Sequence, residues 1–467
     1  MDCATLAVPE NRAHPNGRTI RFGVAIVHAP SGHPTPDPIV FMAGGPSVGA
    51  IQQFAMDYYF ADASYVQDRD VILVDTRGEG LAVPYLSDPR LGCPEFDQAD
   101  HDTFYSSPYP GSNFGPIYDA AIRACHDRLV GSGIDLSAYN AAETAADLEA
   151  LRKALGVKQW NLWAISADGV AGLTYMRLFP GGIRSAVLDS PQSTTWKGGL
   201  DYARGRRALL ERAFAGCAAN AACAARYPDL RTVFYDLVHQ LQAKPVDVRA
   251  MVGGKMMTFH VDGAGFFSDA SGSVDPYNMF NLFSNIWRSA HGQLQQVYRE
   301  LNQSPDPPFF AVDPYVAAGK TESYVCHDII NFLTQADYDA AAAEMPEIAS
   351  DILDPWNDQP TGRAGCAAWD VGRADSAQFQ PVSSRIPTLI TSGEFDQGVT
   401  PNIVRQIPAT LSRSFYYEFP AATHLQMGSF NPVGECARAI AAQFLDAPTR
   451  RPNSGCITAL PQFDYTP

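Results

Sequence analysis

Residues 160–172 read WNLWAISADGVAG, and this stretch decides how the rest of the chain is interpreted. An apolar run ends abruptly at Ser166, and a run with helical character follows it to Phe179. A serine on a sharp turn between a strand and a helix has its hydroxyl lifted above the sheet, which is the geometry of a nucleophile. The usual pattern has glycine two residues before and two residues after the serine. Here those positions hold Ala164 and Asp168, so the stretch by itself is an incomplete signature.

The composition is that of an acidic globular protein. The chain has 467 residues, of which 46% are hydrophobic and 18% are charged, and its formal net charge is −16. Nucleic-acid binding needs basic patches, so we expect no nucleic-acid partner. We find no run of 18 apolar residues, so no membrane span is expected. The pairs His126-Asp127 and His327-Asp328 lack a partner at metal-binding spacing, so we expect no metal site.

The cysteines suggest an oxidising compartment. Eight of the nine fall into neighbours along the chain, which predicts the local disulfides Cys93–Cys125, Cys217–Cys223, Cys326–Cys366 and Cys436–Cys456. Disulfides form outside the reducing cytosol, so a secreted or periplasmic protein is expected. Scattered reduced cysteines in the core are the alternative. Cys3 is left over, and no apolar signal stretch follows Met1, so we expect that a leader has been removed.

Other apolar runs predict a parallel sheet. Buried strands of such a sheet are apolar on both faces and are bounded by turn residues. Runs of this kind lie at 38–42, 71–74, 162–165, 186–188, 387–391 and 415–419, and the clearest helix lies at 140–156. This alternation is typical of an α/β fold with a mostly parallel central sheet flanked by helices. In such folds the chemistry gathers at the carboxyl ends of the strands.

The alternation fades between residues 192 and 380. Helical segments dominate there and are broken by proline-rich turns, which predicts a large helical unit inserted between the later strands. We therefore divide the chain into a first part of the core at 1–191, the insertion at 192–380 and a second part of the core at 381–467. Residues 82–135 are rich in Pro, Ser and Asp and are expected to be mostly loop.

Three residues at predicted strand ends form a candidate catalytic triad. A serine nucleophile needs a base to take its proton and an acid to orient that base. In one class of α/β enzymes the chain order is serine, acid, histidine. Ser166, Asp396 and His424 follow this order, each just after a predicted strand. Glu394 is the alternative acid, and each residue taken alone could be an ordinary turn or packing residue.

Two backbone positions are candidates for stabilising a developing oxyanion. One N–H donor should come from Ala167, the residue after the serine. The other should come from Gly44 or Gly45, which follow the strand at 38–42 and allow the backbone to approach a ligand. The alternative for this Gly-Gly-Pro turn is a plain tight turn before a helix.

Asp168 stands where the usual pattern has glycine. At a helix N-terminus a carboxylate is favoured by the helix dipole by roughly 0.3–1 kcal/mol, and we prefer this structural interpretation. The alternative is functional: its charge would favour the protonated imidazole of His424, or its oxygens would contact a substrate amine or hydroxyl. Ser47, just after the glycine turn, is a second possible substrate contact.

The order of short motifs resembles that of α/β-hydrolases of the proline iminopeptidase and tripeptidyl aminopeptidase type. The matching pieces are Val8–Arg12, Gly44-Gly45-Pro46, Asp75–Gly80, Trp160–Gly169, Gly393–Asp396 with Thr400-Pro401, and the Cys436/Cys456 tail. The resemblance implies the α/β-hydrolase fold, with 192–380 as a helical cap over the active site. It also implies Ser166 as nucleophile, Asp396 as acid and His424 as base. Such enzymes cleave N-terminal residues from peptides, or esters and lactones, without a cofactor.

Departures from the family pattern lie where the substrate is expected. The family has Tyr-Gly after the serine, a glycine where Ser47 stands, and a serine where Ala82 stands. We therefore predict a serine hydrolase that cleaves a small carboxylic ester, lactone or amide. One alternative is an aminopeptidase acting on short peptides, for which Asp262, Asp269 and Glu322 could hold the substrate ammonium. A second alternative is a catalytically inactive homologue that binds a ligand in the same pocket.

Overall fold

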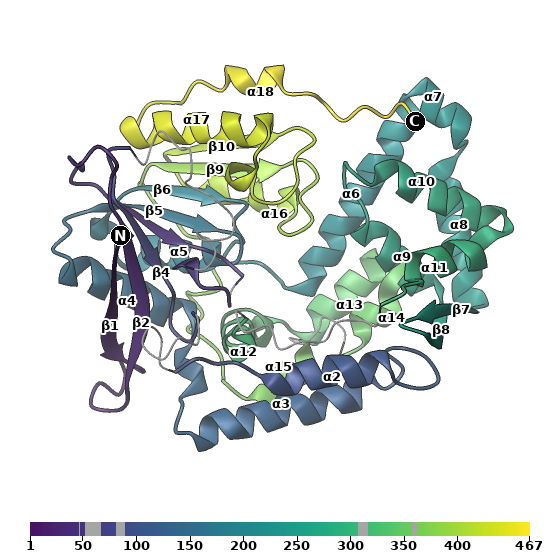
Figure 1. The fold of residues 1–467 in the computed structure, drawn as a ribbon, viewed down its shortest axis with the longest axis horizontal. Helices are drawn as coiled ribbons and strands as arrows, with labels where there is room; N and C mark the ends of the chain where they lie inside the picture. Colours follow the sequence, from purple (N-terminus) through teal and green to yellow (C-terminus); the bar gives the residue numbers. More distant parts are fainter. Residues whose placement is uncertain (46, 52–66, 81–88, 307–315, 357–361) are drawn as a thin grey trace.

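The computed structural model describes residues 1–45, 47–51, 67–80, 89–306, 316–356 and 362–467. A sheet of eight strands lies at the centre of one lobe, in the order β1-β2-β4-β3-β5-β6-β9-β10 (Figure 1). The strands are β1 (Asp2–Pro9), β2 (Thr19–Val27), β3 (Ile39–Met42), β4 (Val71–Val74), β5 (Trp160–Ile165), β6 (Ile183–Asp189), β9 (Thr388–Gly393) and β10 (Ser414–Phe419).

The sheet is mostly parallel, as predicted. The pairings that link β4, β3, β5, β6, β9 and β10 are all parallel, whereas β1 and β2 add an antiparallel hairpin at one edge. Every residue of β3, β4, β5 and β9 is buried, because helices cover both faces. Helices α4 (Ala141–Ala154) and α5 (Asp168–Leu178) pack on one face, and α17 (Pro432–Asp446) packs on the other. The strand ends that carry the candidate triad therefore open toward the same edge of the sheet.

The second lobe has a hydrophobic core of its own. Phe234, Phe267 and Phe283 are among its buried side chains. Its helices are α6 (Gly199–Ala219), α7 (Ala221–Arg226), α8 (Leu230–Ala243), α9 (Gly263–Gly272), α10 (Met279–Arg288), α11 (Leu294–Asn302), α13 (Gln335–Glu344) and α14 (Ala349–Leu353). It also contains an antiparallel hairpin, β7 (Val246–Val252) with β8 (Lys255–Val261), so residues 192–380 are not purely helical. After α18 (Gly455–Ala459), the C-terminal segment returns to this lobe, where Phe463 and Tyr465 pack on its core.

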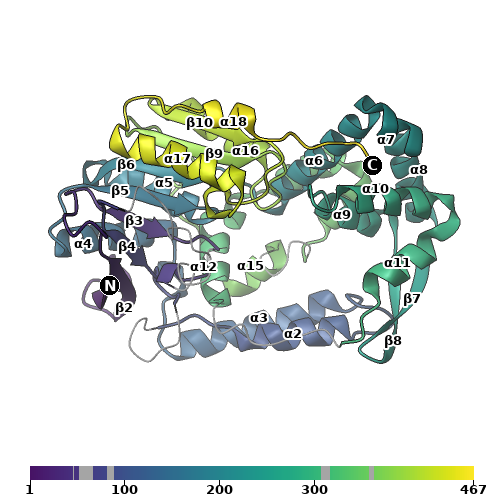
Figure 2. The ribbon, with the colours of Figure 1, turned by 45° about the horizontal axis from the view of Figure 1, so that its top comes forward.

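The expectation that residues 82–135 are mostly loop is wrong in their described part. Helices α2 (Pro94–Phe104) and α3 (Phe114–Gly131) occupy much of this region and lie side by side (Figure 2), and α3 also packs on α15 (Arg363–Trp369). Pro94 is the first residue of α2, where a proline removes no helical hydrogen bond. Pro94 therefore marks a helix start, which a count of turn-forming residues cannot show.

The four predicted disulfides are all present, and Cys3 is free and exposed. Cys93–Cys125 joins the start of α2 to α3, and Cys326–Cys366 joins α12 (Ala318–Asp328) to α15. Four disulfides are compatible with an extracellular or periplasmic protein. In the described part of the chain, none of the helices is long and apolar enough to cross a membrane.

Candidate active site

Ser166 occupies a strained turn between β5 and α5. Its φ is +51°, a left-handed conformation that costs a residue with a side chain about 1–3 kcal/mol and that clusters at functional sites. Two hydrogen bonds to the segment after β6 hold the turn: the Ser166 N–H donates to the Asp189 carbonyl at 3.1 Å, and the Ser166 carbonyl accepts from the Gln192 N–H at 2.9 Å. The packing is close, because a Cβ on Gly172 would lie 2.9 Å from that of Ala164. The small residue at position 164 is therefore required even though it is not glycine.

A chain of hydrogen bonds connects Ser166, His424 and Asp396. His424 Nε2 lies 3.0 Å from Ser166 Oγ, and His424 Nδ1 lies 2.9 Å from each carboxylate oxygen of Asp396. Asp396 is fully buried, while the His424 side chain keeps 29% of its surface exposed. Gly398 leaves room for the imidazole, since a Cβ there would lie 2.9 Å from the ring. The three residues meet although 258 positions separate the serine from the histidine.

Glu394, the alternative acid, points elsewhere. Its carboxylate accepts a hydrogen bond from the Ala421 N–H at 3.0 Å and pairs with Arg212 of α6 at 3.1 Å. Asp396 instead sits in a turn where its carboxylate also accepts from the Val399 N–H at 2.8 Å. The geometry therefore selects Asp396 as the partner of His424.

The electrostatics around His424 favour proton acceptance. Burial lowers the pKa of the imidazole, but the charge of Asp396 and its hydrogen bond to Nδ1 outweigh this effect, and the charge of Asp189 adds to them. The net result is a pKa above the ordinary histidine value. A base within hydrogen-bond reach of a serine hydroxyl, with a charge that stabilises its protonated form, is suited to general-base catalysis.

Asp189 is a site residue that sequence reasoning did not single out. It is the last residue of β6 and is fully buried. Its carboxylate accepts hydrogen bonds from the Thr391 hydroxyl at 2.7 Å and from the Met427 N–H at 3.1 Å. Asp189 therefore holds the segment just after His424 against two neighbouring strands. An acidic residue directly after a buried strand was the signal that could have identified it.

Asp168 contacts the glycine turn that was predicted to form part of the oxyanion site. Its Oδ2 accepts the Gly44 N–H at 3.0 Å, and the carboxylate is buried. Gly44 has a φ of +83°, and a Cβ there would lie 2.8 Å from the Ile165 carbonyl and 3.0 Å from Ser166 Cβ. Asp168 therefore ties the turn after β3 to the turn that carries the serine, while Gly44 keeps the two backbones in contact.

This hydrogen bond changes the assignment of the oxyanion donors. The Gly44 N–H is directed at a carboxylate, so it is not the donor of choice for a substrate oxygen. Within the described residues, the N–H groups of Ala167 and Gly45 have no acceptor in the protein. Ala167 and Gly45 are thus the better candidates.

Ser47 is buried, and its carbonyl accepts from the Ala317 N–H at 3.1 Å. The predictions that concern Pro46, Leu81 and Ala82 fall outside the described residues.

Replacing Asp168 by glycine, the usual residue at this position, tests whether its hydrogen bond to the Gly44 N–H holds the two turns together for catalysis. We expect Asp168→Gly to lower kcat by roughly 10- to 100-fold with little change in KM, because an oxyanion donor is lost when the turn loosens. Asp168→Asn keeps an oxygen acceptor for the Gly44 N–H and should change kcat by only about a few fold. Steady-state kinetics of both variants provide the measurement. A faster Asp168→Gly enzyme would show instead that the aspartate withholds a donor.

Helix α12, within residues 192–380, packs behind the turn that carries Ser166. Tyr324 of α12 donates its hydroxyl to the Ala167 carbonyl at 3.2 Å. On the same helix, buried Lys320 pairs with buried Glu79, whose Oε2 accepts from the Thr76 N–H at 3.0 Å. Burial raises the pKa of Glu79, Lys320 lowers it, Asp168 raises it, and the result is about 8. These contacts anchor α12 to the loops that follow β4 and β5.

One group of potential metal ligands occurs in the described part of the chain. Cys93, Glu95 and Cys125 lie close enough together to share an ion. The two cysteines form a disulfide, and Glu95 pairs with Arg128 at 2.6 Å. The donor set therefore does not fit a metal, since thiolates bind metals and disulfide sulfurs do not.

Sheet topology and strand-end geometry define the α/β-hydrolase fold, and residues 37–222 match the family described as the alpha/beta hydrolase fold. The chain is similar to the probable proline iminopeptidase of Streptomyces coelicolor, with 28% identity over 157 residues, 34% of this chain and 33% of that protein. It is also similar to the tripeptidyl aminopeptidase of Streptomyces lividans, with 28% identity over 199 residues, 41% of this chain and 35% of that protein. The resemblance inferred from the motif order is thereby confirmed.

The chain is also similar to two solved structures, and both alignments extend over nearly the whole chain. The proline iminopeptidase of Mycobacterium smegmatis has a TM-score of 0.40 at 14% identity, and the match covers 96% of this chain and 99% of that one. An esterase from Thermogutta terrifontis has a TM-score of 0.37 at 12% identity, covering 96% of this chain and 100% of that one. By contrast, this chain matches only about a third of the length of each of the two Streptomyces relatives.

Proposed function

We propose that the protein is a serine hydrolase that cleaves a carboxylic ester, lactone or amide bond through Ser166, His424 and Asp396. The observation that carries this proposal is the continuous hydrogen-bond chain from Asp396 through His424 to Ser166 Oγ, with the serine on a left-handed turn. Relatives named as a probable proline iminopeptidase and a tripeptidyl aminopeptidase support hydrolysis as the reaction class. No cofactor is needed for this chemistry.

The geometry supports a two-stage acyl transfer. His424 Nε2 takes the proton of Ser166 Oγ while the oxygen attacks the substrate carbonyl carbon, and Asp396 stabilises the imidazolium that forms. The carbonyl oxygen becomes an oxyanion, for which Ala167 and Gly45 offer N–H donors. His424 then gives the proton to the leaving alcohol or amine, which leaves an acyl-enzyme. Water, deprotonated by the same imidazole, releases the acid and restores Ser166.

Of the acidic residues, the three that the sequence suggested for holding a substrate ammonium, Asp262, Asp269 and Glu322, are poorly suited to that role, which favours an ester or lactone over a peptide at Ser166. Asp262 caps α9 by accepting the Gly265 N–H at 2.8 Å, and Asp269 accepts the Tyr298 hydroxyl at 2.9 Å. Glu322 has an oxygen without a partner in the described structure, but it is fully buried and burial raises its pKa to about 8. A carboxyl group that is largely neutral at pH 7 is a poor partner for a substrate ammonium.

The proposal also covers the role of residues 192–380 and the location of the protein. We propose that residues 192–380 form a cap on a core made of 1–191 and 381–467. The contacts of Tyr324 and Lys320 with the loops behind the serine support this arrangement. α3, from the first segment, packs with α15 of the insertion. The disulfides support secretion or a periplasmic location, where the substrate would be a small ester, lactone or short peptide.

Labelling by a fluorophosphonate probe tests the proposal. The wild-type protein should react at one site, and Ser166→Ala should abolish the reaction, because the probe phosphonylates only an activated serine. A panel of p-nitrophenyl esters, lactones and aminoacyl-nitroanilides, applied to both proteins, then gives the substrate class. Release from the esters without release from the anilides would discard the aminopeptidase alternative.

The same experiment distinguishes a hydrolase from a catalytically inactive homologue. A wild-type protein that folds, binds no probe at Ser166 and hydrolyses none of the panel would contradict the hydrolase proposal. Labelling at a serine other than Ser166 would contradict the assignment of the nucleophile and leave the reaction class intact.

A further inference from the structure

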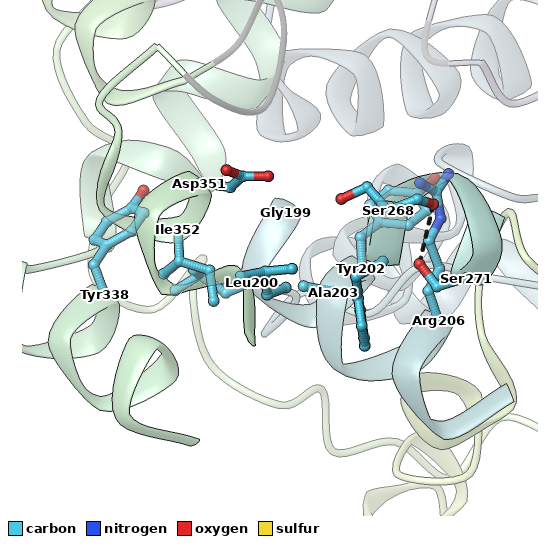
Figure 3. A pocket seen from close by; sticks show the side chains of 12 residues that line it. Gly199, Leu200, Tyr202, Ala203, Arg206, Ser268, Ser271, Tyr338, Asp351 and Ile352 are labelled. Atoms are coloured by element: carbon cyan, nitrogen blue, oxygen red, sulfur yellow. Dashed lines mark hydrogen bonds between the residues drawn. The ribbon is translucent and has the colours of Figure 1, made fainter. Parts of the chain in front are cut away.

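The second lobe contains a cavity whose walls carry opposite charges. Its volume is about 270 Å³, and it is bounded by α6, α9, α13 and α14 (Figure 3). Small-molecule sites have volumes of roughly 300–1,000 Å³, so this cavity suits a ligand of the size of a dipeptide or smaller. Leu200, Phe267 and Ile352 provide apolar surface, while Arg206 and Asp351 provide charge.

Arg206 is the cationic wall of the cavity. Its guanidinium lies 5.4 Å from the centre of the Tyr202 ring, and its Nε is buried without an acceptor. Other arginines of the same helix have carboxylate partners: Arg204 pairs with Glu344, Arg207 with Glu347 and Arg212 with Glu394. No carboxylate of the described residues pairs with Arg206. A buried guanidinium N–H without an acceptor is costly, and an anionic ligand in the cavity would satisfy it.

Asp351 is the anionic wall. Figure 3 shows its carboxylate on the other side of the cavity from Arg206. It accepts a hydrogen bond from the neighbouring Ser350 hydroxyl at 3.3 Å, and within the described chain no lysine or arginine pairs with it. Burial, with the charges of Asp262 and Asp354, raises its pKa to about 6, and the Ser350 hydrogen bond lowers it. A ligand group that donates a hydrogen bond would stabilise the ionised form.

We propose that this cavity binds a small carboxylate whose far end carries an ammonium or hydroxyl group, with the carboxylate on Arg206 and the donor group on Asp351. Guanidinium groups recognise carboxylates through parallel hydrogen bonds, which gives the Arg206 end its specificity. Two opposite charges on separate walls favour a ligand that spans them, such as a short unblocked peptide or a hydroxy acid.

The cavity is structurally connected to the candidate active site. α6 forms one wall, and Gly205 on this helix packs directly on Thr400, which follows the Asp396 turn. Arg212 of α6 pairs with Glu394, two residues before Asp396. A ligand in the cavity is therefore positioned either as part of a substrate or product, or as an effector of the Asp396 turn. The substrate interpretation rests on the proposed function, whereas the binding itself does not.

Calorimetric titration of the full chain carrying Ser166→Ala tests the binding without turnover. The probes are L-alanyl-L-alanine, its C-terminal amide and 6-hydroxyhexanoate. We expect the dipeptide and the hydroxy acid to bind, and the amide to bind at least about tenfold more weakly because the carboxylate is lost. Arg206→Gln should weaken dipeptide binding by at least about tenfold, with Arg206→Lys intermediate because lysine keeps the charge without the planar fork. Arg204→Gln, on the same helix but outside the cavity, should bind like the parent.

Several results would overturn the proposal: no binding of either acid up to roughly 10 mM, equal binding of the amide, or undiminished binding by Arg206→Gln. If Arg206→Gln does not fold, as judged by its thermal transition, the proposal is tested by two other comparisons: dipeptide binding by Arg206→Lys, and binding of the dipeptide amide by the parent. Competitive inhibition of ester hydrolysis by the dipeptide identifies a substrate or product site, and a mixed or activating pattern identifies an effector site. Absence of any hydrolysis would contradict the proposed function and leave the binding result standing.

Discussion

Replacing Ser166 by alanine is expected to lower kcat for the best ester of the panel by about 10⁶-fold, because among the described residues no other nucleophile is within hydrogen-bond distance of His424 Nε2. KM should change little, since the hydroxyl contributes to bond making rather than to binding. The double variant Ser166→Ala/His424→Ala should be no slower than the single one, because the two residues act as one unit. Steady-state and single-turnover kinetics at saturating substrate provide the measurement.

Ser193→Ala is the matched control for this experiment. Ser193 lies in the segment after β6, and its hydroxyl contacts only the Thr195 side chain and backbone within the described residues. This variant should retain the wild-type rate. A Ser166→Ala protein that keeps more than about a hundredth of the rate, or a double variant that is much slower than it, would show that another residue does the chemistry.

Asp396→Asn is expected to lower kcat by about 10⁴-fold and to move the acid limb of the pH profile to lower pH. Only the neutral imidazole can accept the serine proton, so activity in the wild type rises with pH through the raised pKa of His424. In the wild type, the Asp396 charge raises the pKa of His424 against the lowering effect of burial. Without this charge, burial lowers the His424 pKa. The residual rate should therefore reach its plateau at lower pH, which kcat/KM measured from about pH 4 to 9 will show.

Glu394→Gln serves as the control for the acid. Glu394 lies two residues from Asp396, and its replacement by glutamine removes the same charge. Its carboxylate contacts Arg212 and the Ala421 N–H rather than the imidazole. Its substitution should leave the acid limb where it is in the wild type. An acid limb that shifts with Glu394→Gln, and not with Asp396→Asn, would reverse the assignment of the acid.

Much of the core could be predicted from sequence because its determinants are local. The strands β3, β4, β5 and β9 are short apolar runs bounded by turn residues, and both faces are buried, so the run itself identifies the strand. The candidate triad followed from the chain order of three residues at strand ends. The disulfides followed from neighbouring cysteines, which lie only 6 to 40 residues apart.

Other features could not be predicted because their partners are distant in the chain. Lys320 and Glu79 are 241 residues apart, and Asp168 and Gly44 are 124 residues apart. A helix-dipole argument placed Asp168 correctly at the start of α5, but dipoles do not reveal which backbone donor faces the carboxylate. The helices α2 and α3 were missed because their prolines stand at helix starts, where they resemble turn residues.

The sequence alone determined that a buried parallel sheet presents Ser166 at a strand end, with an acid and a histidine following in the order that places them at the same edge. Periodicity and turn residues encode such features within a few positions. Only the tertiary structure decided that Asp396 rather than Glu394 meets His424, and that Asp168 accepts the Gly44 N–H, which leaves Gly45 as the candidate oxyanion donor beside Ala167. These choices depend on distances of about 3 Å between segments far apart in the chain, which only the packed fold establishes.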